Sequence, residues 1–155
     1  MKRLLAMIVV LVLAPLWAAD PPGFNFWSGT QLKDYGKILG PKLNAQKVAS
    51  ESLANYGNHS LMAIYREGSG EAEVHETQAD FFIVQSGQAV LVVGGTVVGG
   101  RTTGPGEIRG ASISGGEKKD LAPGDIVHIP PKIPHQVLLG EGQRFTYLVV
   151  KVDSK

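Results

Sequence analysis

Apolar residues recur with two different periods along the chain, and the change of period divides it into two parts. In the first part, Ser28 and Gln31 form a capping box ahead of a stretch with helical spacing. The apolar positions of this predicted helix are Leu32, Tyr35, Ile38 and Leu39. Gly40-Pro41 ends the helix, and we expect a short helix or loop over residues 43–55.

From Tyr56 onward the apolar period changes to two, which predicts β-strands separated by glycine-rich turns. The predicted strands are His59 to Arg66, Ala72 to Glu76, Phe81 to Gln85, Ala89 to Val93, Thr96 to Val98, Ile126 to Ile129, Gln136 to Leu139 and Phe145 to Val152. Residues 99–120 are rich in glycine and charge, and we expect mostly loop there, with a short hairpin at Ile108 and Ile113 as the alternative. Many short strands with frequent turns predict an all-β sandwich or barrel.

The first residues are typical of a secretory signal peptide. The basic pair Lys2-Arg3 precedes an uncharged apolar run that ends at Ala19 and is too short to span a bilayer comfortably. We therefore expect a periplasmic or secreted protein that has no membrane association after cleavage. An uncleaved N-terminal anchor is the alternative, because a bulky residue stands near the cleavage site where a small one is preferred.

Composition excludes several classes of function. The formal net charge is +1, and it becomes −1 when Lys2 and Arg3 are removed with the leader, so no basic surface predicts a nucleic-acid partner. The chain has no cysteine, which excludes disulfides, thiolate ligands and a cysteine nucleophile. It also lacks a phosphate-binding loop, a GxSxG nucleophile elbow and a dinucleotide fingerprint.

Two segments that are well separated in the chain carry candidate chemistry. In the first, Glu73 and His75 share one face of a predicted strand, and Asp80 opens the next strand. The second segment is a turn, a strand and a turn rich in proline, and it ends at His135. If these strands face one cavity, two imidazoles and one or two carboxylates converge there, which is the ligand set of an open mononuclear metal site.

The first segment resembles the first motif of the cupin superfamily. His75 fits the second histidine of that motif, Asp80 fits its carboxylate, and Gly87 fits its closing glycine. Glu73 stands where the family usually has its first histidine. This departure leaves the role of Glu73 open between ligand and catalytic base.

The second segment resembles the second cupin motif. Gly124, Pro130 and His135 fit that motif, whereas Lys132 replaces a glycine and Leu139 replaces the final asparagine. Together the two motifs make the chain similar to small, single-domain, secreted bacterial cupins with one conserved barrel. The resemblance spans residues 61–152 and implies an all-β cupin jelly-roll barrel with a short N-terminal helical extension.

The pattern and the resemblance together predict three regions. These are a signal peptide over 1–19, an N-terminal extension with one or two short helices over 20–58, and the barrel domain over 59–153. We also expect a homodimer, because cupins often share edge strands and unpaired edges favour pairing.

The resemblance implies one divalent metal ion, namely Fe, Mn, Ni or Zn, held by His75, Asp80 and His135. Glu73 is either a fourth ligand or a catalytic general base, since nearby apolar surface would raise the pKa of a carboxyl group. Candidate contacts to a small-molecule ligand are Phe82, His128 and Tyr147. The aromatic side chains are alternatively core, and the histidine is alternatively packed or on the surface.

Three functions are compatible with these residues. The first is a metal-dependent cupin that acts on a small organic molecule as an isomerase, lyase or oxygenase. The second is a non-catalytic cupin that binds or senses a small molecule. The third is a jelly-roll module with a vestigial site that serves association. Bound metal separates the first two from the third, and turnover separates the first from the second.

Overall fold

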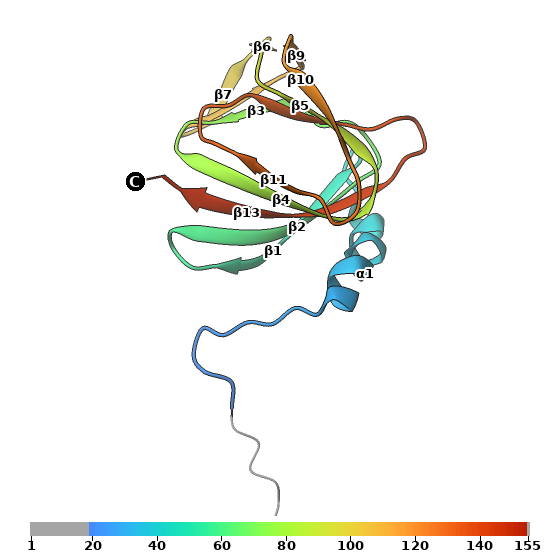
Figure 1. Cartoon of the computed structure of the whole chain (residues 1–155), viewed down its shortest axis with the longest axis vertical. Helices are drawn as coiled ribbons and strands as arrows, with labels where there is room; N and C mark the ends of the chain where they lie inside the picture. The colour runs from blue at the N-terminus through green and yellow to red at the C-terminus, as the bar shows by residue number, and fades with distance from the viewer. Residues whose placement is uncertain (1–18, 155) are drawn as a thin grey trace, which may run out of the picture.

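The computed structural model describes residues 19–154, and its strands form a barrel of two facing antiparallel sheets (Figure 1). The first sheet consists, in spatial order, of β1 (Val48–Asn55), β2 (His59–Arg66), β13 (Phe145–Asp153), β4 (Gln78–Gly87) and β11 (Ile126–Ile129). The second consists of β10 (Glu117–Leu121), β5 (Ala89–Val93), β12 (His135–Leu138), β3 (Ala72–His75), β8 (Glu107–Gly110) and β7 (Arg101–Gly104). A separate ribbon pairs β6 (Thr96–Val98) with β9 (Ser112–Ser114). The prediction of an all-β barrel with a short helical extension is confirmed.

The helical extension is α1 (Gly29–Leu39), followed by the short 3₁₀ helix η1 (Gly40–Lys42). Its predicted capping box is present: the Ser28 hydroxyl accepts from the Gln31 backbone N–H, and the Gln31 side chain accepts from the Ser28 N–H at 2.9 Å. Two of the four free N–H groups of the first turn gain partners in this way, which fixes the start of the helix. Residues 19–28 run below β1 (Figure 1), where the Asn25 side chain donates to the Tyr56 hydroxyl at 2.8 Å.

The predicted signal peptide falls almost entirely outside the described residues. Within residues 19–154, no helix is both long enough and apolar enough to cross a membrane.

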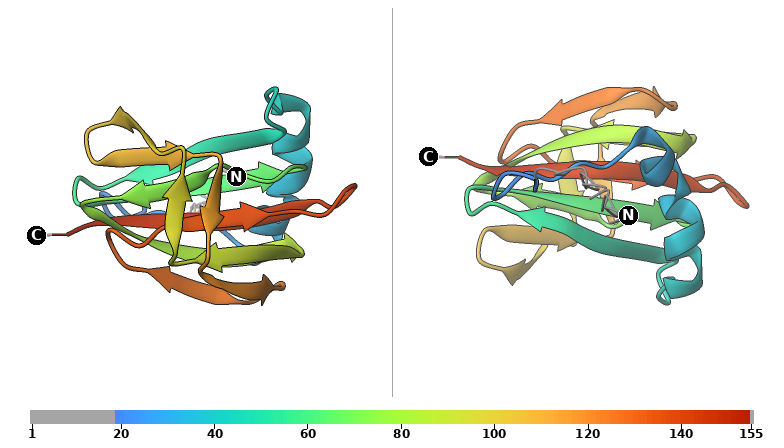
Figure 2. Two further views of the ribbon diagram at one scale, coloured as in Figure 1. Left: turned by 90° about the horizontal axis from the view of Figure 1, so that it is seen from above. Right: turned by 90° about the horizontal axis from the view of Figure 1, so that it is seen from below.

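The five-stranded sheet has apolar side chains packed on both of its faces. Its inner face contributes to the main core between the two sheets, where Phe82, Phe145 and Tyr147 are buried together. On its outer face, Leu39 of α1 packs with residues of β1, β2 and β13, including Tyr65 (Figure 2). Alternation along each strand sends neighbouring residues to opposite faces, so one strand serves both clusters.

The prediction of a helix or loop over residues 43–55 is wrong in its second half, because β1 occupies residues 48–55 and pairs with β2. Strand pairing thus begins ahead of His59, where the barrel domain was predicted to start. Two features hide the strand in the sequence. The inward-facing Ser50 is polar because it lines a cavity, and a bulge between Ser52 and Ala54 interrupts the alternation.

The prediction that residues 99–120 are mostly loop is also wrong, since β7, β8, β9 and β10 lie there. The alternative of one hairpin with Ile108 and Ile113 is wrong in its pairing: β8 pairs with β3 and β7, whereas β9 pairs with β6. Most side chains of these strands are exposed and polar, as is common at sheet edges. The apolar pattern of the sequence therefore could not predict these strands, which are identified by their backbone hydrogen bonds to neighbouring strands.

Candidate functional site

His75 ends β3 with its imidazole buried and held by a carboxylate. Its Nδ1 donates to Glu107, whose two carboxylate oxygens lie 2.8 Å away. Glu107 opens β8 directly opposite His75 in the strand register. A carboxylate on one imidazole nitrogen fixes the tautomer and leaves the Nε2 lone pair available, as in carboxylate–histidine–metal arrangements.

His135 opens β12 and presents the same ring nitrogen in the same way. Its Nδ1 donates to the Ile133 carbonyl oxygen at 3.1 Å. Its Nε2 is buried and has no hydrogen-bond partner among the described residues. Buried polar atoms are rarely left unpaired, because each costs free energy of desolvation, so this nitrogen is available to accept from a water or a ligand or to coordinate an ion.

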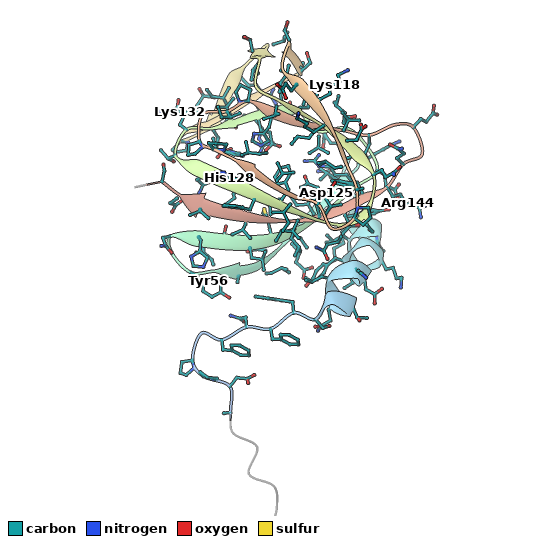
Figure 3. The ribbon with its side chains drawn as sticks, viewed as in Figure 1. Tyr56, Lys118, Asp125, His128, Lys132 and Arg144 are labelled. Carbon is teal, nitrogen blue, oxygen red and sulfur yellow. The ribbon has the colours of Figure 1, made fainter. Side chains whose placement is uncertain are left out.

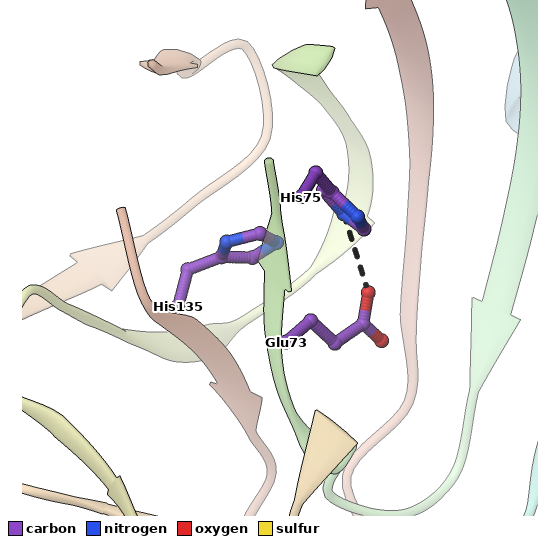
Figure 4. A group of neighbouring side chains, drawn as sticks. All are labelled: Glu73, His75 and His135. Carbon is purple, nitrogen blue, oxygen red and sulfur yellow. Dashed lines mark ion pairs between the residues drawn. The ribbon is translucent and has the colours of Figure 1, made fainter. Parts of the chain in front are cut away.

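Four predicted residues converge at this point. Glu73, His75 and His135 each offer one donor atom, and these atoms lie within 4.8 Å of one another (Figure 4). The Oδ2 atom of Asp80, on β4 of the opposite sheet, lies 3.2 Å from His75 Nε2 and 3.6 Å from His135 Nε2. The structure thus brings together two imidazole nitrogens and two carboxylates from three strands, β3, β4 and β12.

Lys151 on β13 also reaches this cluster and was missed by the sequence analysis. Its Nζ donates to His75 Nε2 at 2.9 Å and to Asp80 Oδ1 at 2.9 Å. Its position could have been predicted from the alternation of the strand, because Lys151 shares the inward face with Tyr147 and Val149. Its ammonium group balances part of the charge of the two carboxylates.

The pKa values of the cluster shift in opposite directions. Burial disfavours charge on His75, but hydrogen bonding to Asp80 and the nearby carboxylates outweigh burial, so the pKa of His75 is raised. Burial also opposes charge on Asp80, yet the protonated His75 ring, which can donate from Nε2, and the ammonium group of Lys151 favour the carboxylate, so the pKa of Asp80 is lowered. Burial lowers the pKa of His135, which favours its neutral form.

Lys132 links the two motif segments through the backbone. Its N–H donates to the His75 carbonyl oxygen at 2.7 Å, and its φ of 67° lies in the left-handed region. This is the position at which the resembled motif has glycine, and a non-glycine residue there carries conformational strain. The bond fixes the turn before His135 against the end of β3.

Two arginines surround Glu73 on the side away from the histidines. Arg109 on β8 donates from Nη1 to Glu73 Oε1 at 2.6 Å, and Arg66 Nη2 lies 4.0 Å from the same oxygen. Arg66 Nε donates to the Tyr147 hydroxyl at 3.0 Å. Neither arginine was predicted, because Arg109 lies in the supposed loop and the inward face of β2 was not assigned.

These groups line a cavity of about 280 Å³ between the sheets. Phe82 and Tyr147 line the cavity and also belong to the core, so their role as ligand contacts stays a prediction. The structure does not bring His128 there: its side chain is exposed on the outer face of β11 and stacks on Phe81 with ring centroids 4.6 Å apart (Figure 3). Val127 and Ile129 take the inward positions of that strand, which leaves the outer face to His128.

The donor set fits a first-row divalent ion. Neutral imidazole nitrogens and carboxylate oxygens suit Fe, Mn, Ni and Zn, and both Nδ1 atoms are already fixed by hydrogen bonds. The unpaired Nε2 of His135 is the observation that favours an ion over a plain hydrogen-bond network. Lys151 must leave His75 and Asp80 for all four donors to bind one ion.

Comparison with known proteins gives the fold its name. No protein-family model and no curated protein sequence matches the chain. Solved structures do match, including the TT1209 protein from Thermus thermophilus, with 20% identity over 73% of this chain and 90% of that chain and a TM-score of 0.53. The polyketide cyclase RemF from Streptomyces resistomycificus matches with 20% identity over 69% of this chain and 66% of that chain, with a TM-score of 0.50. The cupin domain of Cnp3 from Schizosaccharomyces pombe matches with 9% identity over 74% of this chain and 67% of that chain, with a TM-score of 0.52.

These identities are low, so the likeness establishes the fold alone. The chain has the cupin fold, and the resemblance inferred from the two motifs is confirmed at that level.

Proposed function

We propose that the protein binds one divalent metal ion through His75, His135, Asp80 and Glu73 and acts on a small organic molecule in the barrel cavity. The observation that carries this proposal is the buried, unpaired Nε2 of His135 beside His75 Nε2 and two carboxylates. A bound ion would supply Lewis-acid polarisation or lower the pKa of a bound water. Isomerase, lyase and oxygenase chemistry are all compatible with this donor set.

The residues of the chain contribute positioning and charge. Glu107 holds the His75 ring, and Arg109 holds the Glu73 carboxylate at the cavity side of the cluster. Lys151 compensates Asp80 in the metal-free protein and, with 21% of its side chain exposed, has room to turn away from the cluster. Released from Asp80, its ammonium group would remain close enough to donate a proton or a hydrogen bond to a bound molecule.

A non-catalytic binding or sensing cupin is the second candidate. The 2.6 Å ion pair between Arg109 and Glu73 favours it, because a carboxylate that is engaged by an arginine is less available as a general base. The substitution Glu73→Gln separates the roles of this residue. If Glu73 is a ligand, metal affinity falls; if it is a base, metal affinity holds and turnover falls.

The experiment is metal analysis of protein purified without chelating resin, followed by titration of stripped protein with Fe, Mn, Ni and Zn. We expect one ion per chain, with binding that weakens at acidic pH as the histidines take up protons. The double substitution His75→Ala with His135→Ala should abolish binding and leave the barrel folded. His59→Ala with His128→Ala is the matched control, because both of these histidines are exposed. Failure to retain any of the four metals at stoichiometric levels would refute the metal proposal.

We further propose that the protein is exported to the periplasm or secreted. The basic pair Lys2-Arg3 and the uncharged run up to Ala19 support this. N-terminal sequencing of the exported protein should begin between Ala19 and Pro22. A cytoplasmic protein that retains Met1 would contradict it.

A homodimer is also proposed. The five-stranded sheet has the edge strands β1 and β11. On β11, Ile126 is 70% exposed and lies opposite Ile83 of β4, and His128 lies opposite the partly exposed Phe81. Edge pairing that covers these side chains would remove both exposed apolar surface and unpaired backbone groups. Small-angle scattering that shows a monomer at high concentration would rule this out and leave the metal proposal untouched.

A further inference from the structure

Arg66 is a buried cation with unused hydrogen-bond donors. Only 9% of the residue is exposed, and its Nε donates to Tyr147. Among the described residues, no acceptor lies within hydrogen-bonding distance of either of its Nη atoms, since Glu73 Oε1 is 4.0 Å from Nη2. The Nη atoms are not among the fully buried polar atoms that lack a partner in the described residues, so they are open to the cavity and not sealed in the core. Because Arg66 lines the cavity, these donors are available to a molecule inside it.

Tyr147 offers another donor to the same cavity. Its side chain is 1% exposed, and burial raises the pKa of its phenol, which keeps the hydroxyl protonated. Its oxygen accepts from Arg66 Nε, so its own proton is free to be donated. The guanidinium edge and the phenol O–H thus stand side by side on neighbouring strands β2 and β13.

The charges around the cavity favour an anion once metal is bound. Arg66, Arg109 and Lys151 line it together with Glu71, Glu73 and Asp80, so that three cations face three carboxylates. A divalent ion at the proposed site adds two positive charges that no further lining carboxylate balances. A negatively charged molecule would offset part of this excess positive charge within the barrel.

We infer that the cavity binds a small organic carboxylate, with its carboxylate group held by the Nη donors of Arg66 and the hydroxyl of Tyr147. The planar guanidinium edge matches the two oxygens of a carboxylate, and the phenol supplies a third donor. A phosphate would call for more donors, and α1, a helix whose N-terminus could supply them, packs on the outer face of the sheet. The volume of about 280 Å³ limits the ligand to a small acid. This inference names the substrate class of the function proposed above, but the carboxylate contacts themselves need no metal.

Calorimetric titration tests the inference with lactate, mandelate and gluconate as probes. Lactamide, mandelamide and gluconamide are their neutral counterparts, and glycerol phosphate is the phosphate probe. Each is titrated into stripped, dialysed protein and into manganese-loaded protein. At least one acid should bind to both forms, roughly tenfold or more tightly than its amide. Equal binding of acid and amide, binding of the phosphate alone, or no binding of any acid would overturn the inference.

Substitutions then locate the carboxylate. Arg66→Lys keeps the charge but loses the planar fork, and it should weaken acid binding roughly 10- to 100-fold while the amides are unaffected. Tyr147→Phe keeps the buried ring and removes only the hydroxyl, so it tests the same contact if the Arg66 variant does not fold. Arg144→Lys is the matched control. The Arg144 side chain is 75% exposed and pairs with Glu67, and it does not line the cavity. Acid binding that survives both Arg66→Lys and Tyr147→Phe would overturn the assignment.

The two proposals fail separately. If acids bind to stripped protein but no metal is retained, the metal proposal is refuted and the carboxylate site stands. If metal binds stoichiometrically but acids bind no better than amides, the carboxylate inference is refuted and the metal site stands.

Discussion

The two faces of the five-stranded sheet differ in chemistry although the same strands supply both. On β2, Tyr65 points outward beneath α1, whereas Arg66 points into the cavity. On β13, Leu148 points outward, whereas Tyr147 and Lys151 point inward. The outer cluster is apolar and closed by a helix, and the inner face combines a core with a polar cavity.

Within one strand, the outward residues therefore contribute mainly to stability and the inward polar residues mainly to binding. Adjacent residues in a strand have different roles, because successive side chains point to opposite faces of the sheet. Substitutions on the outer face should change the free energy of unfolding without changing metal or ligand affinity. Substitutions on the inner polar face should change metal or ligand affinity, and should change stability only where they leave a buried charge without its partner.

The largest effect is expected for Leu39→Ala on the outer face. Leu39 is fully buried between α1 and the sheet, so its truncation should lower the free energy of unfolding by about 2–5 kcal/mol. Urea denaturation measures this loss, and metal titration should give unchanged affinity. Ile38→Ala is the matched control, because Ile38 is 46% exposed on the same helix and should cost much less. Equal losses for the two variants, or a loss of metal affinity in Leu39→Ala, would contradict the separation of the faces.

Glu107→Gln should have the next largest effect and act on binding. Glutamine can still accept from His75 Nδ1 but carries no negative charge, so the ring loses basicity and part of its orientation, and metal affinity should fall roughly 10- to 100-fold. Competition with a fluorescent chelator measures this affinity. Glu117→Gln on the exposed edge strand β10 is the control and should leave it unchanged. An unchanged affinity in Glu107→Gln would contradict this supporting role of Glu107.

Lys151→Met on the inner face should raise metal affinity while lowering stability without metal. The ammonium group competes with an ion for His75 and Asp80, and its removal should tighten binding roughly tenfold, the size of one charge-assisted hydrogen bond. Without metal, Asp80 would be a buried charge with less compensation, so the stripped variant should melt at lower temperature and recover on metal addition. Lys118→Met on β10 is the exposed control (Figure 3). Weaker metal binding in Lys151→Met would show that the lysine supports the site.

Tyr65→Phe should have the smallest effect and is confined to the outer cluster. Burial, together with a hydrogen bond to Glu67, raises the pKa of Tyr65 from 10.0 to about 12. Between these two values the unfolded phenol ionises and the folded one does not, so stability is complete below pH 10 and is lost as pH rises toward 12. The variant should lose this part of the alkaline decline, as urea denaturation at several pH values would show. At neutral pH it should lose only about 1 kcal/mol, for one hydrogen bond. An identical alkaline decline in both proteins would contradict the shift.

Local signals in the sequence were enough to predict much of the fold and the centre of the site. Short apolar segments bounded by glycine turns located strands such as β2 and β5, and the capping box at Ser28 located the start of α1, because these signals lie within a few residues of each other. The motif spacing placed His75, Asp80 and His135 together in one barrel, and the structure confirms that they meet.

The partners of those residues follow only from the folded barrel. Glu107 meets His75 because β8 pairs with β3 in one register, and a shift of one residue would turn its side chain to the other face. Arg66 and Lys151 reach the cavity through pairing between β2 and β13 and the inward parity of both strands. Strands such as β1, β8 and β10 lack an apolar rhythm because their side chains face a polar cavity or solvent. Local sequence records which residues can be buried, whereas contacts between strands far apart in the chain depend on register, which is set by the whole barrel.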